Sequence, residues 1–153
     1  MTHSALRIVM ISALASLLLA CSKPPAKEAI ATAIKELAAA IEARQSSTVL
    51  GYLGDDFTLQ ESRQGNLGRE EVKRLMMLVF YRHRETSIVL TQIDITLDPV
   101  RTDKAEARFN ALVTGGSGGI LPDQAELYRL NSEWRLDGDW QLQQLSAKRA
   151  LEQ

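Results

Sequence analysis

The sequence is poor in the residues that hold metals and disulfides. Its 153 residues include one cysteine, Cys21, and two histidines, of which only His83 lies beyond the first 20 positions. A single cysteine has no disulfide partner in its own chain, and it cannot build a zinc site from several thiolates. We therefore expect neither a disulfide framework nor a metal or other cofactor.

An excess of charge of one sign is also missing. The chain has 18 basic and 19 acidic residues, a net charge of −1, and no run of lysines or arginines. Its densest basic cluster, Arg82-His83-Arg84, falls where a helix is expected to end, and cations there complement the helix dipole. This balance argues against a nucleic-acid partner.

No apolar run is long enough to cross a membrane. Residues 8–20 are an apolar stretch of 13 positions behind Arg7, the only formal charge before Cys21. A membrane-spanning helix needs about 20 apolar residues. A short apolar run behind a basic start is instead typical of an export signal peptide.

The motif Leu18-Leu19-Ala20-Cys21 resembles the lipobox of bacterial lipoproteins. The resemblance implies that residues 1–20 are removed, that Cys21 carries the lipid, and that residues 21–25 form a tether to the membrane. Ser22 stands where an aspartate usually means retention at the inner membrane, which implies an outer-membrane protein facing the periplasm. An ordinary signal peptide followed by a chance cysteine is the alternative.

Helical periodicity dominates the first half of the remaining chain. Apolar residues recur every three or four positions in residues 26–44 and again from Arg69 to Arg82. Glu70 and Glu71 open the second of these segments and Arg82 closes it, as the helix dipole favours. Residues 48–53 predict a shorter helix, for which Ser46 or Ser47 provides a cap.

Alternating patterns dominate the second half. A short strand over residues 57–61 lies between turns at 54–56 and 64–68, and longer strands are expected over residues 87–97, 105–113, 124–136 and 140–145. Asp137-Gly138 suits the turn of a hairpin. In the 87–97 strand the pattern puts five residues on one face: Val89, Thr91, Ile93, Ile95 and Leu97. The order predicts an α+β fold, a curved antiparallel sheet with two to three N-terminal helices packed on one face.

Three motifs in this order resemble the nuclear transport factor 2-like superfamily, a cystatin-like cone that includes ketosteroid isomerase. Residues 52–59 look like its short helix, double acid and first strand, residues 68–72 like the glycine-led start of its third helix, and residues 135–140 like its last hairpin. The resemblance covers residues 26–148, followed by a tail of residues 149–153. It implies a pocket between sheet and helices, which members use for isomerase or dehydratase chemistry, for ligand binding or for protein contacts.

The resemblance places Glu61 where ketosteroid isomerase has its general base. The hydrogen-bond donors that stabilise the enolate do not carry over, because the first helix reads Lys35-Glu36-Leu37 without the phenol and residues 131–133 offer no secure match. A base without such donors loses most of the catalytic stabilisation. We therefore expect Glu61 to be a solvent-exposed carboxylate at the end of a strand.

Other candidate sites have simpler explanations. His83 lies between two arginines at a helix end, so we expect it to be exposed and not catalytic. The glycine-rich residues 114–119 lack the Lys-Ser/Thr of a phosphate-binding loop and predict a hairpin loop. Six aromatic residues are candidates for lining the pocket, and for each of them a place in the core is the favoured explanation: Tyr52, Phe57, Tyr81, Phe109, Tyr128 and Trp134.

These features favour a lipid-anchored, periplasm-facing module that binds a small apolar ligand or an envelope protein without catalysis. One alternative is an enzyme of the isomerase or dehydratase type with Glu61 as general base. The other is a structural accessory of an envelope assembly that forms a homodimer through its sheet. Glu61 facing an occupied pocket favours the enzyme, whereas a filled core with an exposed apolar sheet face favours the accessory.

Overall fold

A computed structural model describes residues 23–61, 65–83, 85–116 and 124–150. The predicted signal segment and Cys21 lie outside this range, as do residues 117–119 of the glycine-rich stretch. The helices and strands, in chain order, are α2 (Ala26–Glu42), α3 (Ser46–Tyr52), β1 (Leu53–Glu61), β2 (Gly65–Gly68), α4 (Arg69–Arg82), β3 (Glu85–Leu97), β4 (Lys104–Gly116), β5 (Gln124–Asp137) and β6 (Asp139–Arg149).

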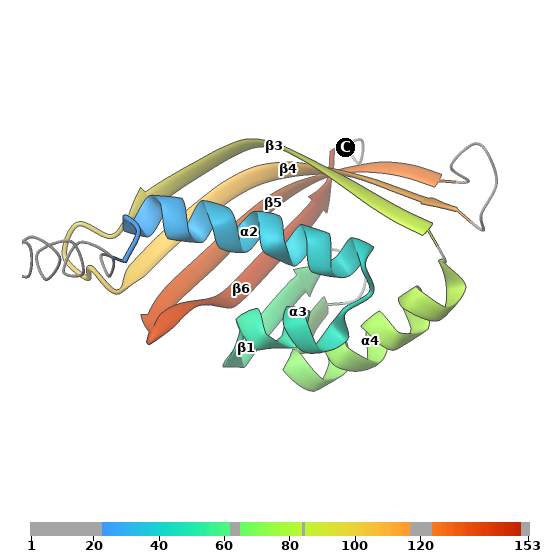
Figure 1. The fold of residues 1–153 in the computed structure, drawn as a ribbon, viewed down its shortest axis with the longest axis horizontal. Coiled ribbons are helices and arrows are strands. Elements are labelled where there is room, and N and C mark those ends of the chain that lie inside the picture. The colour runs from blue at the N-terminus through green and yellow to red at the C-terminus, as the bar shows by residue number, and fades with distance from the viewer. Residues whose placement is uncertain (1–22, 62–64, 84, 117–123, 151–153) are drawn as a thin grey trace, which may run out of the picture.

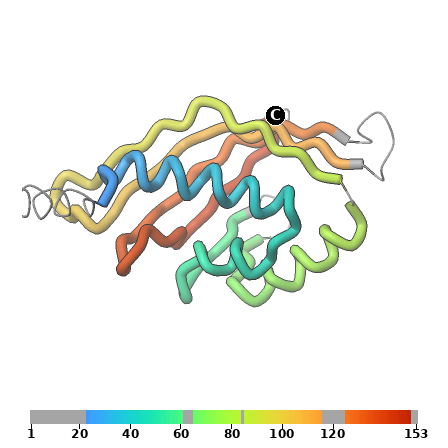
Figure 2. Tube along the Cα trace, viewed as in Figure 1, coloured from blue at the N-terminus to red at the C-terminus, as the bar shows by residue number. Residues whose placement is uncertain are grey.

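The six strands form one curved sheet with the helices on its concave side (Figures 1 and 2). The strand order is β2-β1-β6-β5-β4-β3, and every neighbouring pair is antiparallel except β1 and β6, which are parallel. Helix α2 lies along the long strands, while α3 and α4 cover the sheet near β1. The predicted α+β fold with three helices on one face of a curved sheet is confirmed.

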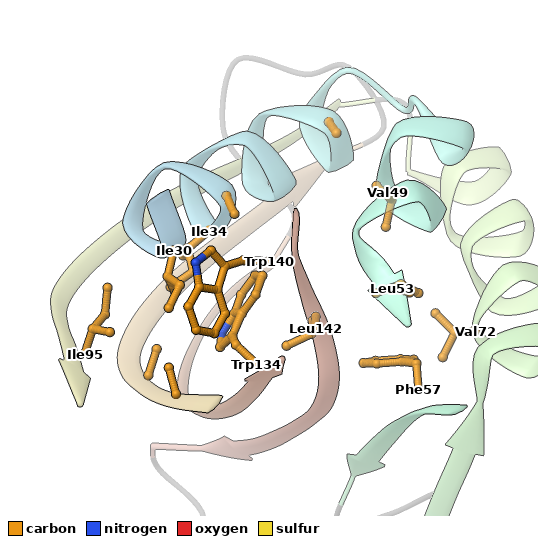
Figure 3. Close-up of a cluster of buried hydrophobic side chains, with 14 of the residues drawn as sticks. Ile30, Ile34, Val49, Leu53, Phe57, Val72, Ile95, Trp134, Trp140 and Leu142 are labelled. Carbon is orange, nitrogen blue, oxygen red and sulfur yellow. The ribbon is translucent and has the colours of Figure 1, made fainter. Parts of the chain in front are cut away.

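Each helix turns its apolar stripe towards the sheet. Ile30 and Ile34 of α2 are buried against Ile95, Trp134 and Trp140, and Val72 of α4 is buried with Phe57 of β1 (Figure 3). Neither Ser46 nor Ser47 provides the cap that was expected for the short helix. Helix α3 begins at Ser46 and no side chain caps it, since Gln45 occupies the N-cap position.

The turn predicted at residues 54–56 is wrong, because these residues belong to β1. The register of β1 against β6 shifts between Leu53 and Thr58, so this part of the strand is irregular. Its residues also have the composition of a turn. A Cβ on Gly54 would lie 2.4 Å from Nε2 of Gln143 on β6, so a larger residue there would require the Gln143 side chain to move. Most of the second predicted turn is also a strand, because residues 65–68 form β2.

The sequence predicts that alternate residues of the 87–97 strand share one face along its whole length. A β-bulge interrupts this alternation in β3. Gln92 has a φ of 56°, and the register of β3 against β4 shifts between Thr91 and Asp94. The extra residue reverses the alternation, because one inserted position moves every later side chain to the other face. Val89, before the bulge, is therefore 53% exposed, although it is an odd-numbered residue like the buried Ile95 after the bulge.

Candidate active site

A cavity of about 370 Å³ lies between the concave face of the sheet and the helices. Residues of α2, α3, α4 and five strands line it, and nearly all of them are apolar. Examples from opposite walls are Leu37 of α2, Met76 of α4, Leu90 of β3 and Leu145 of β6. A space of this size and character suits a small apolar molecule with few polar groups.

The structure brings four of the six predicted pocket aromatics to this cavity. Phe57, Phe109, Tyr128 and Trp134 are among its lining residues, whereas Tyr81 is 86% exposed on the outer side of α4. Tyr52 also lies elsewhere, because its hydroxyl donates a hydrogen bond to Glu36. Partial burial and that hydrogen bond raise the pKa of Tyr52 to about 12. Ligand binding by the four lining residues stays a prediction.

A polar cluster lies at one end of the cavity. The Tyr128 hydroxyl donates a hydrogen bond to Glu126, whose other carboxylate oxygen is 3.0 Å from Nη2 of Arg149 on β6. The side chains of Glu126 and Arg149 are about one third exposed, so this end reaches solvent. Burial, and then the hydrogen bond to Glu126, raise the pKa of Tyr128 above its usual value.

Glu61 is positioned at the same end of the sheet. It is the last residue of β1 and pairs with Ala147 of β6, which lines the cavity two residues before Arg149. Phe57 and Leu59 line the cavity, and Glu61 follows them at the two-residue spacing of one strand face. Its side chain lies outside the described part of the chain, so the expected exposure of Glu61 stays a prediction.

His83, at the end of α4, lies beside Gly115 of β4 and is not among the residues that line the cavity. Its backbone N–H donates a hydrogen bond of 2.8 Å to the Val79 carbonyl at the C-terminal end of α4. Its side chain is half-buried, whereas we expected it to be exposed. Nδ1 lies 3.6 Å from where a Cβ on Gly115 would stand, and Gly115 follows the lining residue Val113 on the same face of β4.

The opposite face of the sheet carries an exposed apolar row. Val89 pairs with Leu112, and Leu112 pairs with Leu127, across three neighbouring strands. These side chains are 53%, 39% and 40% exposed. The row is short, and the core on the other face of the sheet is hollow rather than filled.

Two further features of the described residues concern membranes and metals. Their helices include none that is both long and apolar enough to cross a bilayer. Among the same residues, no three histidine, cysteine, aspartate or glutamate side chains gather closely enough to hold a metal ion.

Comparisons with known proteins find likeness in structure only. No protein-family model and no curated protein sequence matches the chain. A proposed scytalone dehydratase from Novosphingobium aromaticivorans superposes with a TM-score of 0.72 at 17% identity, over 81% of this chain and 83% of its own. A proposed dehydratase of the NTF2-like family from Streptomyces avermitilis gives 0.69 at 18% identity, over 82% and 96%. A hexachlorocyclohexane dehydrochlorinase from Novosphingobium barchaimii gives 0.64 at 20% identity, over 80% and 85%.

These neighbours contradict the expected non-catalytic module. These three proteins share the fold over most of their length and are named as enzymes, so the missing counterparts of the hydrogen-bond donors of ketosteroid isomerase are no reason to exclude catalysis. The expectation failed because it tested the chain against a single catalytic arrangement, whereas one fold hosts several. At these identities the likeness establishes architecture and not reaction. The chain has the nuclear transport factor 2-like fold.

Proposed function

We propose that this protein is an enzyme that eliminates water or a similar leaving group from a small apolar substrate held in the cavity. The observation that carries the proposal is the apolar cavity with the Tyr128 hydroxyl in its wall and the ion pair of Glu126 and Arg149 bonded to that hydroxyl. Such an arrangement holds a carbon skeleton by burial and leaves proton transfer to a few placed groups. Neighbours named as dehydratases and a dehydrochlorinase support elimination.

Glu61 is the general base of this proposal and Tyr128 is the acid. The carboxylate takes a proton from a substrate carbon, and the electron pair of that bond forms a double bond to the neighbouring carbon. The bond from this second carbon to the hydroxyl oxygen breaks, and the Tyr128 phenol gives the departing oxygen its proton, so that water leaves. Glu61 returns its proton to Tyr128 through solvent.

A specific observation supports His83 as a second candidate for the base. Its imidazole is half-buried and lies beside Gly115, two residues beyond the lining residue Val113 on β4. The two candidates differ in the variant that abolishes turnover and in the pH dependence of the rate.

The test measures dehydration of an aryl β-hydroxyketone, which yields a strongly absorbing conjugated enone. We expect Glu61→Gln to lower kcat by about 100-fold or more, the usual contribution of a general base. Glu133→Gln, on an exposed position of β5, is the matched control and should leave the rate unchanged. Loss of turnover in His83→Asn but not in Glu61→Gln would reassign the base. A protein that neither dehydrates such ketones nor exchanges their α-hydrogens in deuterium oxide would refute the enzymatic proposal.

The cellular setting is a separate part of the proposal. The short apolar run of residues 8–20 and the lipobox-like motif ending at Cys21 support export, cleavage before Cys21 and lipidation of that residue. More than one attached acyl chain makes such an anchor stable. Ser22 supports an outer-membrane location in which the domain faces the periplasm.

A further inference from the structure

One polar side chain is buried in the wall of the apolar cavity. Ser132 of β5 is 3% exposed, and it is the only polar residue among the buried side chains of the described chain. It lines the cavity together with apolar neighbours such as Phe109, Leu130 and Leu142. Burying a hydroxyl costs free energy unless its hydrogen-bonding capacity is used.

The hydrogen bonds of Ser132 determine what it can offer to a ligand. Oγ donates its proton to the carbonyl of Ala107 at 3.1 Å and accepts the indole N–H of Trp134 at 2.9 Å. A serine oxygen has one proton and two acceptor positions. The proton and one acceptor position are therefore engaged within the protein, and a single acceptor position is left for the cavity.

From this geometry we infer that Ser132 is a specificity-determining residue, which selects ligands with a hydrogen-bond donor such as a hydroxyl group at their inner end. The inference rests on the proposed function, since it defines the substrate class of the same cavity. A carbonyl or ether oxygen at that point faces the remaining lone pair of Ser132 Oγ and forms no hydrogen bond with it. A hydroxyl or N–H group gains a hydrogen bond inside an apolar enclosure, where few alternatives compete.

The polar cluster gives the cavity a second recognition point. Tyr128 and Ser132 lie on the same face of β5, four residues apart, which is about 13 Å at the rise of a strand. The substrate class is thus an apolar body with a donor group at its inner end and the reacting carbons near Tyr128. Ser132 acts in binding and is separate from the groups that move protons.

Calorimetric titration with β-naphthol and its methyl ether tests the inference. The two molecules share one ring system, but only β-naphthol has a donor proton. We expect the protein to bind β-naphthol about 2- to 12-fold more tightly, the range of one net hydrogen bond. Ser132→Ala should remove or reverse the preference. Ser146→Ala should keep it, since Ser146 lies on β6 and is not among the lining residues.

A second measurement needs no variant. β-Naphthol should shift the indole N–H resonance of Trp134, which bonds to Ser132, and the methyl ether should shift it less; Trp140 serves as internal reference. Equal binding of both molecules, or a preference that persists in Ser132→Ala, would refute the role of Ser132 and leave the proposed function standing. If neither molecule binds, the cavity is not a ligand site, and the proposed function fails together with the inference.

Discussion

Replacement of Ala111 by leucine tests whether the cavity is open or closed in solution. Ala111 is 3% exposed and lines the cavity from β4, between Leu90 of β3 and Tyr128 of β5 in the strand register. Ala107, four residues earlier on the same face, is 1% exposed and is not a lining residue. The two alanines are a matched pair, because strand, face and burial are the same and only the space in front of them differs.

The expected effects have opposite signs. Leucine adds three carbon atoms, and burying them is worth at most about 2.4 kcal/mol at about 0.8 kcal/mol each. Fixing the longer side chain costs about 0.5–1 kcal/mol, so Ala111→Leu should stabilise the protein by about 1.5 kcal/mol if it fills empty space. Ala107→Leu adds the same atoms to a packed site and should destabilise it by about 1–3 kcal/mol.

Urea unfolding of the two variants measures the difference. The midpoint should rise for Ala111→Leu and fall for Ala107→Leu with the slope unchanged, since the surface exposed on unfolding stays nearly the same. Leucine at position 111 should also weaken binding of β-naphthol, because it occupies ligand space. Equal destabilisation by both substitutions would show that the cavity is filled in solution, and the argument for a ligand site would fail with it.

Two further predictions concern the predicted anchor and Tyr52. Cys21→Ser should abolish incorporation of a fatty-acid analogue, because no other residue of the chain can take a thioether lipid; label that persists in the variant would refute lipidation. Tyr52 should titrate near pH 12, and since its pKa is raised in the folded state, its contribution to stability should be complete below pH 10 and lost as the pH rises to about 12. Absorbance titration and urea unfolding of the protein and of Tyr52→Phe should show this, and a difference in stability that stays constant up to pH 12 would contradict it.

The helices and the long strands could be predicted because their patterns are local. Helix α4 has the predicted bounds, and β4 turns Ala105, Ala107 and Ala111 inward as its alternation indicates. The shorter elements could be predicted only in part, because short strands depend on their pairing partners as well as on local composition. The helix expected over residues 48–53 is α3, whereas residues 65–68, expected as a turn, form β2. Residues 54–56 have the composition of a turn and lie in the irregular part of β1, where its register against β6 shifts.

The site was predictable in its residue types but not in its arrangement. Aromatic residues suit both core and pocket, and only the packing of helices on the sheet separates Phe57 from the exposed Tyr81. The position of His83 depends on where α4 ends relative to β4, a relation between segments about 30 residues apart. The roles of Ser132 and Trp134 depend on hydrogen bonds that no spacing in the sequence encodes.

The bulge at Gln92 divides β3 into two parts, in which residues of opposite parity face the inside of the curved sheet. Before it, the even positions Ile88 and Leu90 face the cavity, and after it the odd positions Ile95 and Leu97 face the helix side. Deleting that one residue would restore a regular ladder in which Ile88, Leu90, Ile93, Ile95 and Leu97 alternate along the same inner face. Ile88 and Leu90 line the cavity and Ile95 and Leu97 do not, so substitutions before the bulge can reshape the ligand space while the core after it stays unchanged.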